Sequence, residues 1–122
     1  MTQSLYERIG GQVAVEQAVD IFYRKVLSDP LLAPFFEFTD MQRQVARQRA
    51  FLTMAFGGPN HYDGRALRDA HKRFVEQGMA EAHFVAVVEH LLDTCAELGV
   101  ANEDIAEVKA IALSVHDDVL NL

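Results

Sequence analysis

Residues 39–78 read TDMQRQVARQRAFLTMAFGGPNHYDGRALRDAHKRFVEQG, and this stretch predicts two helices joined by a turn. Apolar residues recur every three or four positions from residue 39 to about residue 56 and again over residues 65–77, as on the buried face of a helix. Gly57-Gly58-Pro59 separates the two runs, because glycine favours a helix end and proline cannot continue a helix. Thr39 and Gln42 have the spacing of a capping box at the start of the first helix.

Polar side chains interrupt the apolar faces of these helices. Gln44 and Gln48 lie one turn apart in the first helix, and His71 lies on the apolar side of the second. Tyr23, in an earlier amphipathic segment, places a hydroxyl at the edge of the core. Each residue taken singly is explained by a hydrogen bond to the backbone. Together, on three helices around one apolar volume, they indicate a cavity for a small molecule or cofactor.

The remaining sequence is helical in pattern as well. Further helices are expected over residues 4–8, 12–28 and 81–98, and a last one from residue 102 to about residue 119. Pro30 and Pro34 leave room only for short turns between the second helix and residue 39, and Asn102 is the expected cap of the last helix. No alternating strand pattern is present, so the predicted class is all-α, with residues 1–122 forming one domain.

Composition limits the classes of function. The net charge of −7 argues against nucleic acid as a partner, because phosphates repel an acidic surface. Seven of the eleven Lys and Arg residues fall between Arg43 and Arg73, where they form either two solvated helix faces or a rim for a small anion. Cys95 is the single cysteine and is interpreted as a small apolar filler. Without a signal peptide or a membrane-spanning run, the expected compartment is the cytoplasm.

The other histidines show no metal-binding spacing. His83 and His90 share a helix face, but no third ligand follows at a suitable position. His61 falls in the expected loop, and His116 lies beside Asp117 on the last helix, where an exposed histidine near carboxylates is the simpler interpretation.

Taken in order, the motifs of this chain resemble those of the group I truncated haemoglobins, especially cyanobacterial and bacterial ones. The succession AFGG, YDGR, AHK is the most specific part of this resemblance, which covers nearly the whole chain. The matching residues are Gly10-Gly11, Phe22-Tyr23, Phe35-Phe36, Gln44, Gln48, Ala50-Phe51-Leu52-Thr53, Ala55-Phe56-Gly57-Gly58, Tyr62-Asp63-Gly64-Arg65, Ala70-His71-Lys72, His83-Phe84, Leu98-Gly99-Val100 and Asp118-Val119-Leu120-Asn121.

The resemblance implies a shortened globin, in which two antiparallel helix pairs form a 2-on-2 sandwich around haem b. It makes His71 the iron ligand, with one ring nitrogen on the metal and the other donating to a backbone carbonyl. The expected haem contacts are Phe35, Phe36, Phe51, Leu52, Leu67 and Phe84. The expected partners of the haem propionates are Arg43, Arg47, Arg65 and Lys72.

The resemblance also implies the chemistry of the ligand side. Tyr23, Gln44 and Gln48 become donors that stabilise bound O₂ and slow its release. Some cyanobacterial relatives have an iron-binding histidine where this chain has Arg47, and arginine does not normally ligate iron. Those relatives also link a last-helix histidine to the haem; His116 lies one residue out of step with that position, so covalent attachment is an open alternative.

Three functions follow for testing. The first is a haem protein that binds O₂, NO and CO and oxidises NO to nitrate with an external electron donor. The second is an O₂ store, carrier or sensor without turnover, and the third is a helical interaction module without a cofactor. A monomer is expected, because the core uses the apolar stripes.

Overall fold

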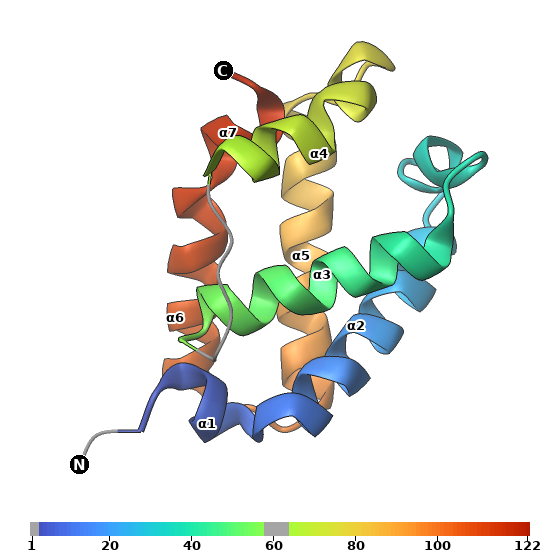
Figure 1. The fold of residues 1–122 in the computed structure, drawn as a ribbon. Coiled ribbons are helices and arrows are strands. Elements are labelled where there is room, and N and C mark those ends of the chain that lie inside the picture. The colour runs from blue at the N-terminus through green and yellow to red at the C-terminus, as the bar shows by residue number, and fades with distance from the viewer. Residues whose placement is uncertain (1–2, 58–63) are drawn as a thin grey trace.

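The computed structural model describes residues 3–57 and 64–122, and helices make up most of this part of the chain (Figure 1). Their order confirms the all-α prediction, and the ends of every predicted helix except the last lie within two residues of the expected positions. The elements are α1 (Leu5–Ile9), α2 (Gly11–Leu27), the 3₁₀ turn η1 (Ala33–Phe36), α3 (Met41–Ala55), α4 (Gly64–Glu76), α5 (Glu81–Glu97), α6 (Asn102–Ser114) and α7 (His116–Leu120).

Two helix pairs form the body of the molecule. Helix α2 packs against both α3 and α5, and α5 packs against α6. Figure 1 shows the α2–α3 pair lying across the α5–α6 pair, with α4 and α7 together at one end. Gly10 allows the sharp turn between α1 and α2, because its φ of 119° belongs to the left-handed region and a side chain there would meet Ala14.

The apolar stripes predicted from the sequence form the core. Val19, Val26 and Val108 are completely buried, and they join α2 to α6 through one continuous apolar cluster. Thr94 is equally buried, and its hydroxyl donates to the backbone carbonyl of His90 at 2.7 Å, which satisfies the polar group within the core. Burial raises the pKa of the Cys95 thiol to about 11, so this side chain stays protonated among apolar neighbours.

The expected capping box at Thr39 is wrong. Asp40 caps α3 instead, and its Oδ1 accepts from the backbone N–H groups of Gln42 at 3.1 Å and Arg43 at 3.4 Å. The Thr39 hydroxyl is used elsewhere, because it donates to the Phe35 carbonyl and accepts from the Arg73 guanidinium. A carboxylate also suits the positive end of the helix dipole better than a hydroxyl.

The last predicted helix is in fact two. Helix α6 ends at Ser114, Val115 leaves the helical conformation, and α7 begins at His116. The Ser114 hydroxyl donates to the Ile111 carbonyl at 2.6 Å, which offers the backbone an alternative bond at this point. His116 then reaches across to Glu81 on α5. The expected cap at Asn102 is also wrong. Asn102 is the first residue of α6, and Ala101 occupies the cap position.

Among the described residues, no helix is long and apolar enough to cross a membrane.

His116 gives the fold a measurable pH dependence. Its ring nitrogens lie 2.8 Å from Asp117 Oδ1 and 2.6 Å from Glu81 Oε2, and these carboxylates, Asp117 first, raise its pKa above the usual 6.5. A raised pKa in the folded protein means that the stabilisation is fully present below the unfolded value and is lost as the pH rises through the folded value.

We therefore expect His116→Ala to lower the melting temperature more at about pH 5.5 than at about pH 8.5. Thermal unfolding followed by circular dichroism across this range measures the difference between the two proteins. Ser114→Ala is the control, because it changes the same junction without removing a titrating group. A difference between parent and His116→Ala that stays constant or widens with pH would contradict the assigned ion pairs.

Candidate cofactor site

A cavity lies between the two helix pairs, and α2, η1, α3, α4, α5, α6 and α7 or the residues beside them line it. Its wall is mostly apolar and aromatic, with four polar side chains: Tyr23, Gln44, Gln48 and His71. These are the residues that the sequence placed around one apolar volume. A wall of this kind suits a largely apolar ligand that is oriented by a few polar contacts.

Helix α4 supplies the only imidazole among the described lining residues, that of His71. The Nδ1 atom of His71 lies 2.9 Å from the backbone carbonyl oxygen of Leu67, one turn earlier in α4. A carbonyl only accepts, so Nδ1 carries the proton and Nε2 keeps a free lone pair. Burial lowers the pKa of His71 and the bond to Leu67 opposes this shift, so the ring is neutral at physiological pH and can ligate a metal.

Helices α2 and α3 contribute the other polar groups. Gln44 Nε2 donates to the Tyr23 hydroxyl oxygen at 3.1 Å, which joins α3 to α2 at the cavity wall. The Tyr23 ring is held edge-on between Phe22, at 5.0 Å between centroids, and Phe36, at 5.9 Å. Packing therefore fixes the phenol ring, and the Tyr23 hydroxyl oxygen accepts the hydrogen bond from Gln44.

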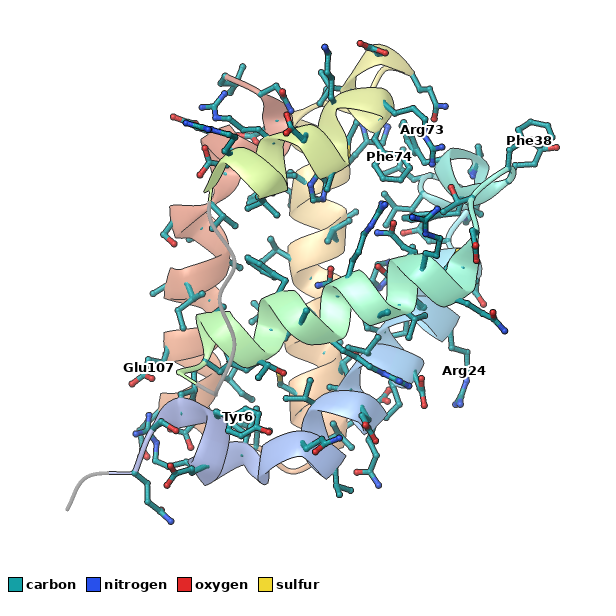
Figure 2. All side chains as sticks on the ribbon, viewed as in Figure 1. Tyr6, Arg24, Phe38, Arg73, Phe74 and Glu107 are labelled. Atoms are coloured by element: carbon teal, nitrogen blue, oxygen red, sulfur yellow. The ribbon has the colours of Figure 1, made fainter. Side chains whose placement is uncertain are left out.

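Aromatic rings close the end of the cavity near η1. Phe36 lies 5.3 Å from Phe74 of α4, and Phe35 packs edge-on against both Phe74 and His83. The guanidinium of Arg73 lies over the Phe74 ring, 5.3 Å from its centroid, and Figure 2 shows the two residues close together. These contacts join α4 to η1. Phe35 and Phe36, the two phenylalanines predicted to contact the cofactor, both line the cavity.

The other expected cofactor contacts divide into two groups. Phe51, Leu67 and Phe84 line the cavity. Leu52 is not among the lining residues and is instead buried in the helix core, with 1% of its surface exposed. His116 is also absent from the lining residues, and its ring meets that of Phe84 edge-on at 4.8 Å between centroids.

The expected anion partners lie on the outside. Arg43, Arg47, Arg65 and Lys72 are all exposed, and none of them is among the residues that line the cavity. In the described ranges, no group of three or more His, Cys, Asp or Glu side chains is placed to hold a metal ion.

Sequence reasoning missed part of the wall. Several of these side chains lie on apolar helix stripes, and a stripe has the same spacing whether it faces packed side chains or a cavity. Met79, between α4 and α5, carried no periodic signal at all. The lining residues that were not predicted as site residues are Phe22, Val26, Leu32, Phe74, Met79, Val87, Val88, Leu91, Ala112, Val115 and Val119.

The arrangement offers a metal one neutral nitrogen from α4, and it offers a small polar ligand hydrogen bonds from α2 and α3. The apolar wall between them suits the faces of a large planar cofactor, which can bring further metal ligands of its own.

Comparison with known proteins identifies the family of this arrangement. The family model described as bacterial-like globin matches residues 4–121. The group 1 truncated haemoglobin GlbN of Synechocystis sp. is 52% identical over 121 residues, which cover 97% of this chain and 98% of that protein. The group 1 truncated haemoglobin of Tetrahymena pyriformis is 42% identical, covering 97% of this chain and 95% of that protein.

Solved structures give the same result. The 2/2 haemoglobin of Synechococcus sp. PCC 7002, in its cyanomet state with covalently attached haem, has a TM-score of 0.92 at 44% identity and covers 98% of this chain and 100% of its own. Fe(III) truncated haemoglobin of Tetrahymena pyriformis has a TM-score of 0.87 at 42% identity, covering 97% of this chain and 98% of its own. Variants of the latter protein carry Tyr→Phe or Gln→Glu substitutions. The chain therefore belongs to the bacterial-like globins and is a group 1 truncated haemoglobin.

Proposed function

We propose that this protein binds haem b in the cavity, where His71 Nε2 would bind the iron, and that it reversibly binds O₂. The observation that carries the proposal is the hydrogen bond from His71 Nδ1 to the Leu67 carbonyl, because it leaves the Nε2 lone pair for a metal. The donor set fits haem, since a neutral imidazole stands in an otherwise apolar and aromatic wall. Haem, when bound, supplies a ferrous iron that coordinates diatomic gases.

The polar residues of α2 and α3 would stabilise such a gas. Tyr23, Gln44 and Gln48 line the cavity, and their hydroxyl and amide groups donate hydrogen bonds. A hydrogen bond to a charged acceptor contributes about 1.5–3 kcal/mol, so these donors would slow the release of a bound diatomic ligand that carries negative charge roughly ten- to hundredfold. The same residue types were substituted in the Tetrahymena pyriformis protein, which supports their choice here.

We propose a non-covalent haem. His116 is the candidate for a covalent link, but Glu81 and Asp117 hold both of its ring nitrogens, and His116 is not among the cavity-lining residues. The Synechococcus sp. PCC 7002 protein has covalently attached haem. In this chain the ring would have to leave both carboxylates before it could reach a haem edge.

We further propose that NO and O₂ meet in the cavity and form nitrate. The conversion of NO and O₂ to NO₃⁻ consumes one electron, so an external donor must supply it. The donors Tyr23, Gln44 and Gln48 favour this reaction because they would retain O₂ long enough for NO to arrive. Without such a donor the same site serves as an O₂ store, carrier or sensor. A cofactor-free interaction module is disfavoured, because its cavity would need no neutral imidazole.

Replacing the proposed iron ligand should remove haem. We expect His71→Ala to purify with less than about a tenth of the parent's haem absorbance, because the axial bond is lost, and added imidazole should restore part of it. Visible spectra before and after haem addition measure this. His90→Ala is the matched control, since His90 pairs with Asp29 and is not among the cavity-lining residues. Acid–acetone should extract the haem of the parent protein. A coloured His71→Ala variant with an unchanged axial nitrogen signal would contradict the assignment.

Removing the phenol oxygen should speed O₂ release. We expect Tyr23→Phe to raise the O₂ dissociation rate roughly ten- to hundredfold, since the variant keeps the ring packing and loses only the hydroxyl. Stopped-flow displacement of O₂ by CO measures the rate. The control is Tyr6→Phe on α1, because Tyr6 is absent from the cavity lining. Equal rates in parent and Tyr23→Phe would show that Tyr23 is not the distal donor.

Rapid mixing of the oxygenated protein with NO distinguishes an NO dioxygenase from an O₂ carrier. When the oxygenated protein meets NO, we expect conversion to ferric haem and nitrate within the mixing time, and repeated turnover when a reductant is present. Stopped-flow spectra and nitrate assays follow the two products. A single slow conversion that no reductant sustains would leave O₂ binding in place and reject the NO dioxygenase proposal.

A further inference from the structure

Helix α4, which carries His71, depends on α7 for its position. Leu67, His71 and Phe74 of α4 line the cavity, and on this side of the helix Phe74 packs against Phe35 and Phe36 of the short turn η1. Among the described elements, α4 packs extensively against α7 alone. When one face of a helix lines a cavity, the contacts on its other faces largely decide where the helix lies and how it is rotated about its axis.

Three hydrogen bonds join α4 to α7 and the two residues after it. Arg68 Nε donates to Asp118 Oδ1 at 2.8 Å, and Arg68 Nη2 donates to the main-chain oxygen of Leu122 at 2.7 Å. In return, Asn121 Nδ2 donates to the Arg68 backbone carbonyl at 3.1 Å. Arg68, Asp118, Asn121 and Leu122 form what we call the α4–α7 clamp. It holds Arg68 by its side chain and its backbone together.

The backbone after α7 is shaped for these contacts. Asn121 has a φ of 58° and is the only non-glycine residue of the described chain with a positive φ. This turn brings the Leu122 N–H to the Asp117 carbonyl at 2.9 Å and leaves the main-chain oxygen of Leu122 facing Arg68. Asparagine tolerates the left-handed region better than most residues, and here its amide also makes one of the clamp bonds.

The clamp acts directly beside the imidazole contact. The Leu67 carbonyl that accepts from His71 Nδ1 belongs to the peptide unit joining Leu67 to Arg68. The next carbonyl, that of Arg68, is the one that Asn121 binds. A shift or rotation of α4 would therefore move the Leu67 carbonyl and the His71 ring together, and the clamp resists both movements.

We propose that Arg68 is a positioning residue, which through Asp118, Asn121 and Leu122 fixes the orientation of the His71 imidazole toward the haem iron. The inference rests on the proposed role of His71 as axial ligand. Arg68 is not among the cavity-lining residues, so it acts on His71 through the helix rather than by direct contact in the cavity. Its action is mechanical: the clamp keeps the helix from tilting and so would keep the His71 imidazole in one orientation.

The iron–histidine stretching band reports this geometry. In Arg68→Ala we expect the band, recorded by resonance Raman just after photolysis of the CO complex, to shift and broaden, because the imidazole samples more orientations. Haem transfer to excess apomyoglobin should be about two- to fivefold faster than in the parent, the range expected for a partly exposed ion pair. Asp118→Ala should have the same effects in smaller measure, since the bond from Arg68 to Leu122 remains.

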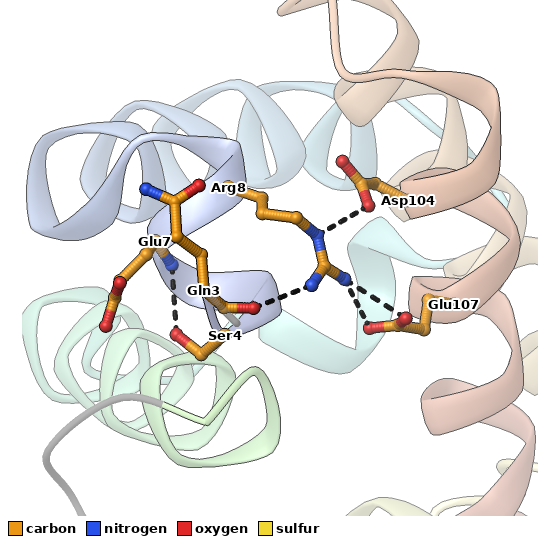
Figure 3. Close-up of polar contacts among 6 residues, drawn as sticks. All are labelled: Gln3, Ser4, Glu7, Arg8, Asp104 and Glu107. Carbon is orange, nitrogen blue, oxygen red and sulfur yellow. Dashed lines mark hydrogen bonds and ion pairs between the residues drawn. The ribbon is translucent and has the colours of Figure 1, made fainter. Parts of the chain in front are cut away.

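Arg8 provides a matched control. It makes the same kind of contacts between α1 and α6, with Nε 3.0 Å from Asp104, Nη2 3.0 Å from Glu107 and a bond to the Gln3 carbonyl (Figure 3). Arg8→Ala should lower the melting temperature and leave the iron–histidine band unchanged. Arg68→Lys keeps a charge near Asp118 and should return part of the parent's band position.

The outcomes separate this inference from the proposed function. A parent without an iron–histidine band overturns His71 as ligand, and the clamp inference with it. A parent with the band, but with the same band and the same haem transfer rate in Arg68→Ala, overturns the clamp alone. An equal band shift in Arg8→Ala also overturns it, because the effect would then be one of general stability.

Discussion

The hydrogen bond between His71 Nδ1 and the Leu67 carbonyl is the constraint on which the functional structure depends. It settles the tautomer of the ring, holds the ring plane against its own helix and directs the remaining lone pair away from that helix. Burial acts in the same direction, because it lowers the pKa of His71 and keeps the ring neutral. A cationic imidazole in this position would repel a metal.

Residues that line the cavity also make the contacts that hold α2, α3, α4 and η1 together. Phe36 packs against Tyr23 on α2 and Phe74 on α4, so one side chain of η1 braces both sides of the site. The bond from Gln44 to Tyr23 ties α3 to α2 at the same place. The Tyr23 phenol is thus held by packing as well as by a hydrogen bond.

The break between α6 and α7 at Val115 determines how α7 contacts the helix that carries His71. A continuous last helix would carry residues 116–120 onward along the axis of α6. The break instead lets α7 lie against α4, where Asp118 and the two residues after the helix bind Arg68. His116 secures the other side of α7 by its bond to Glu81 of α5. The short helix therefore joins the imidazole-bearing helix to the body of the protein.

The sequence alone determined the helical class, the positions of most helices within one or two residues, and the family. It also singled out His71, Tyr23, Gln44 and Gln48, because polar residues on apolar stripes are costly unless they have a purpose. The tertiary structure decided which stripe residues face the cavity and which, like Leu52, are buried in the core. It also decided that Asp40 caps α3, since Arg73 and Phe35 occupy the Thr39 hydroxyl. The pairing of Arg68 with Asp118 joins residues 50 positions apart, and no local periodicity encodes a contact that only the folded backbone brings together.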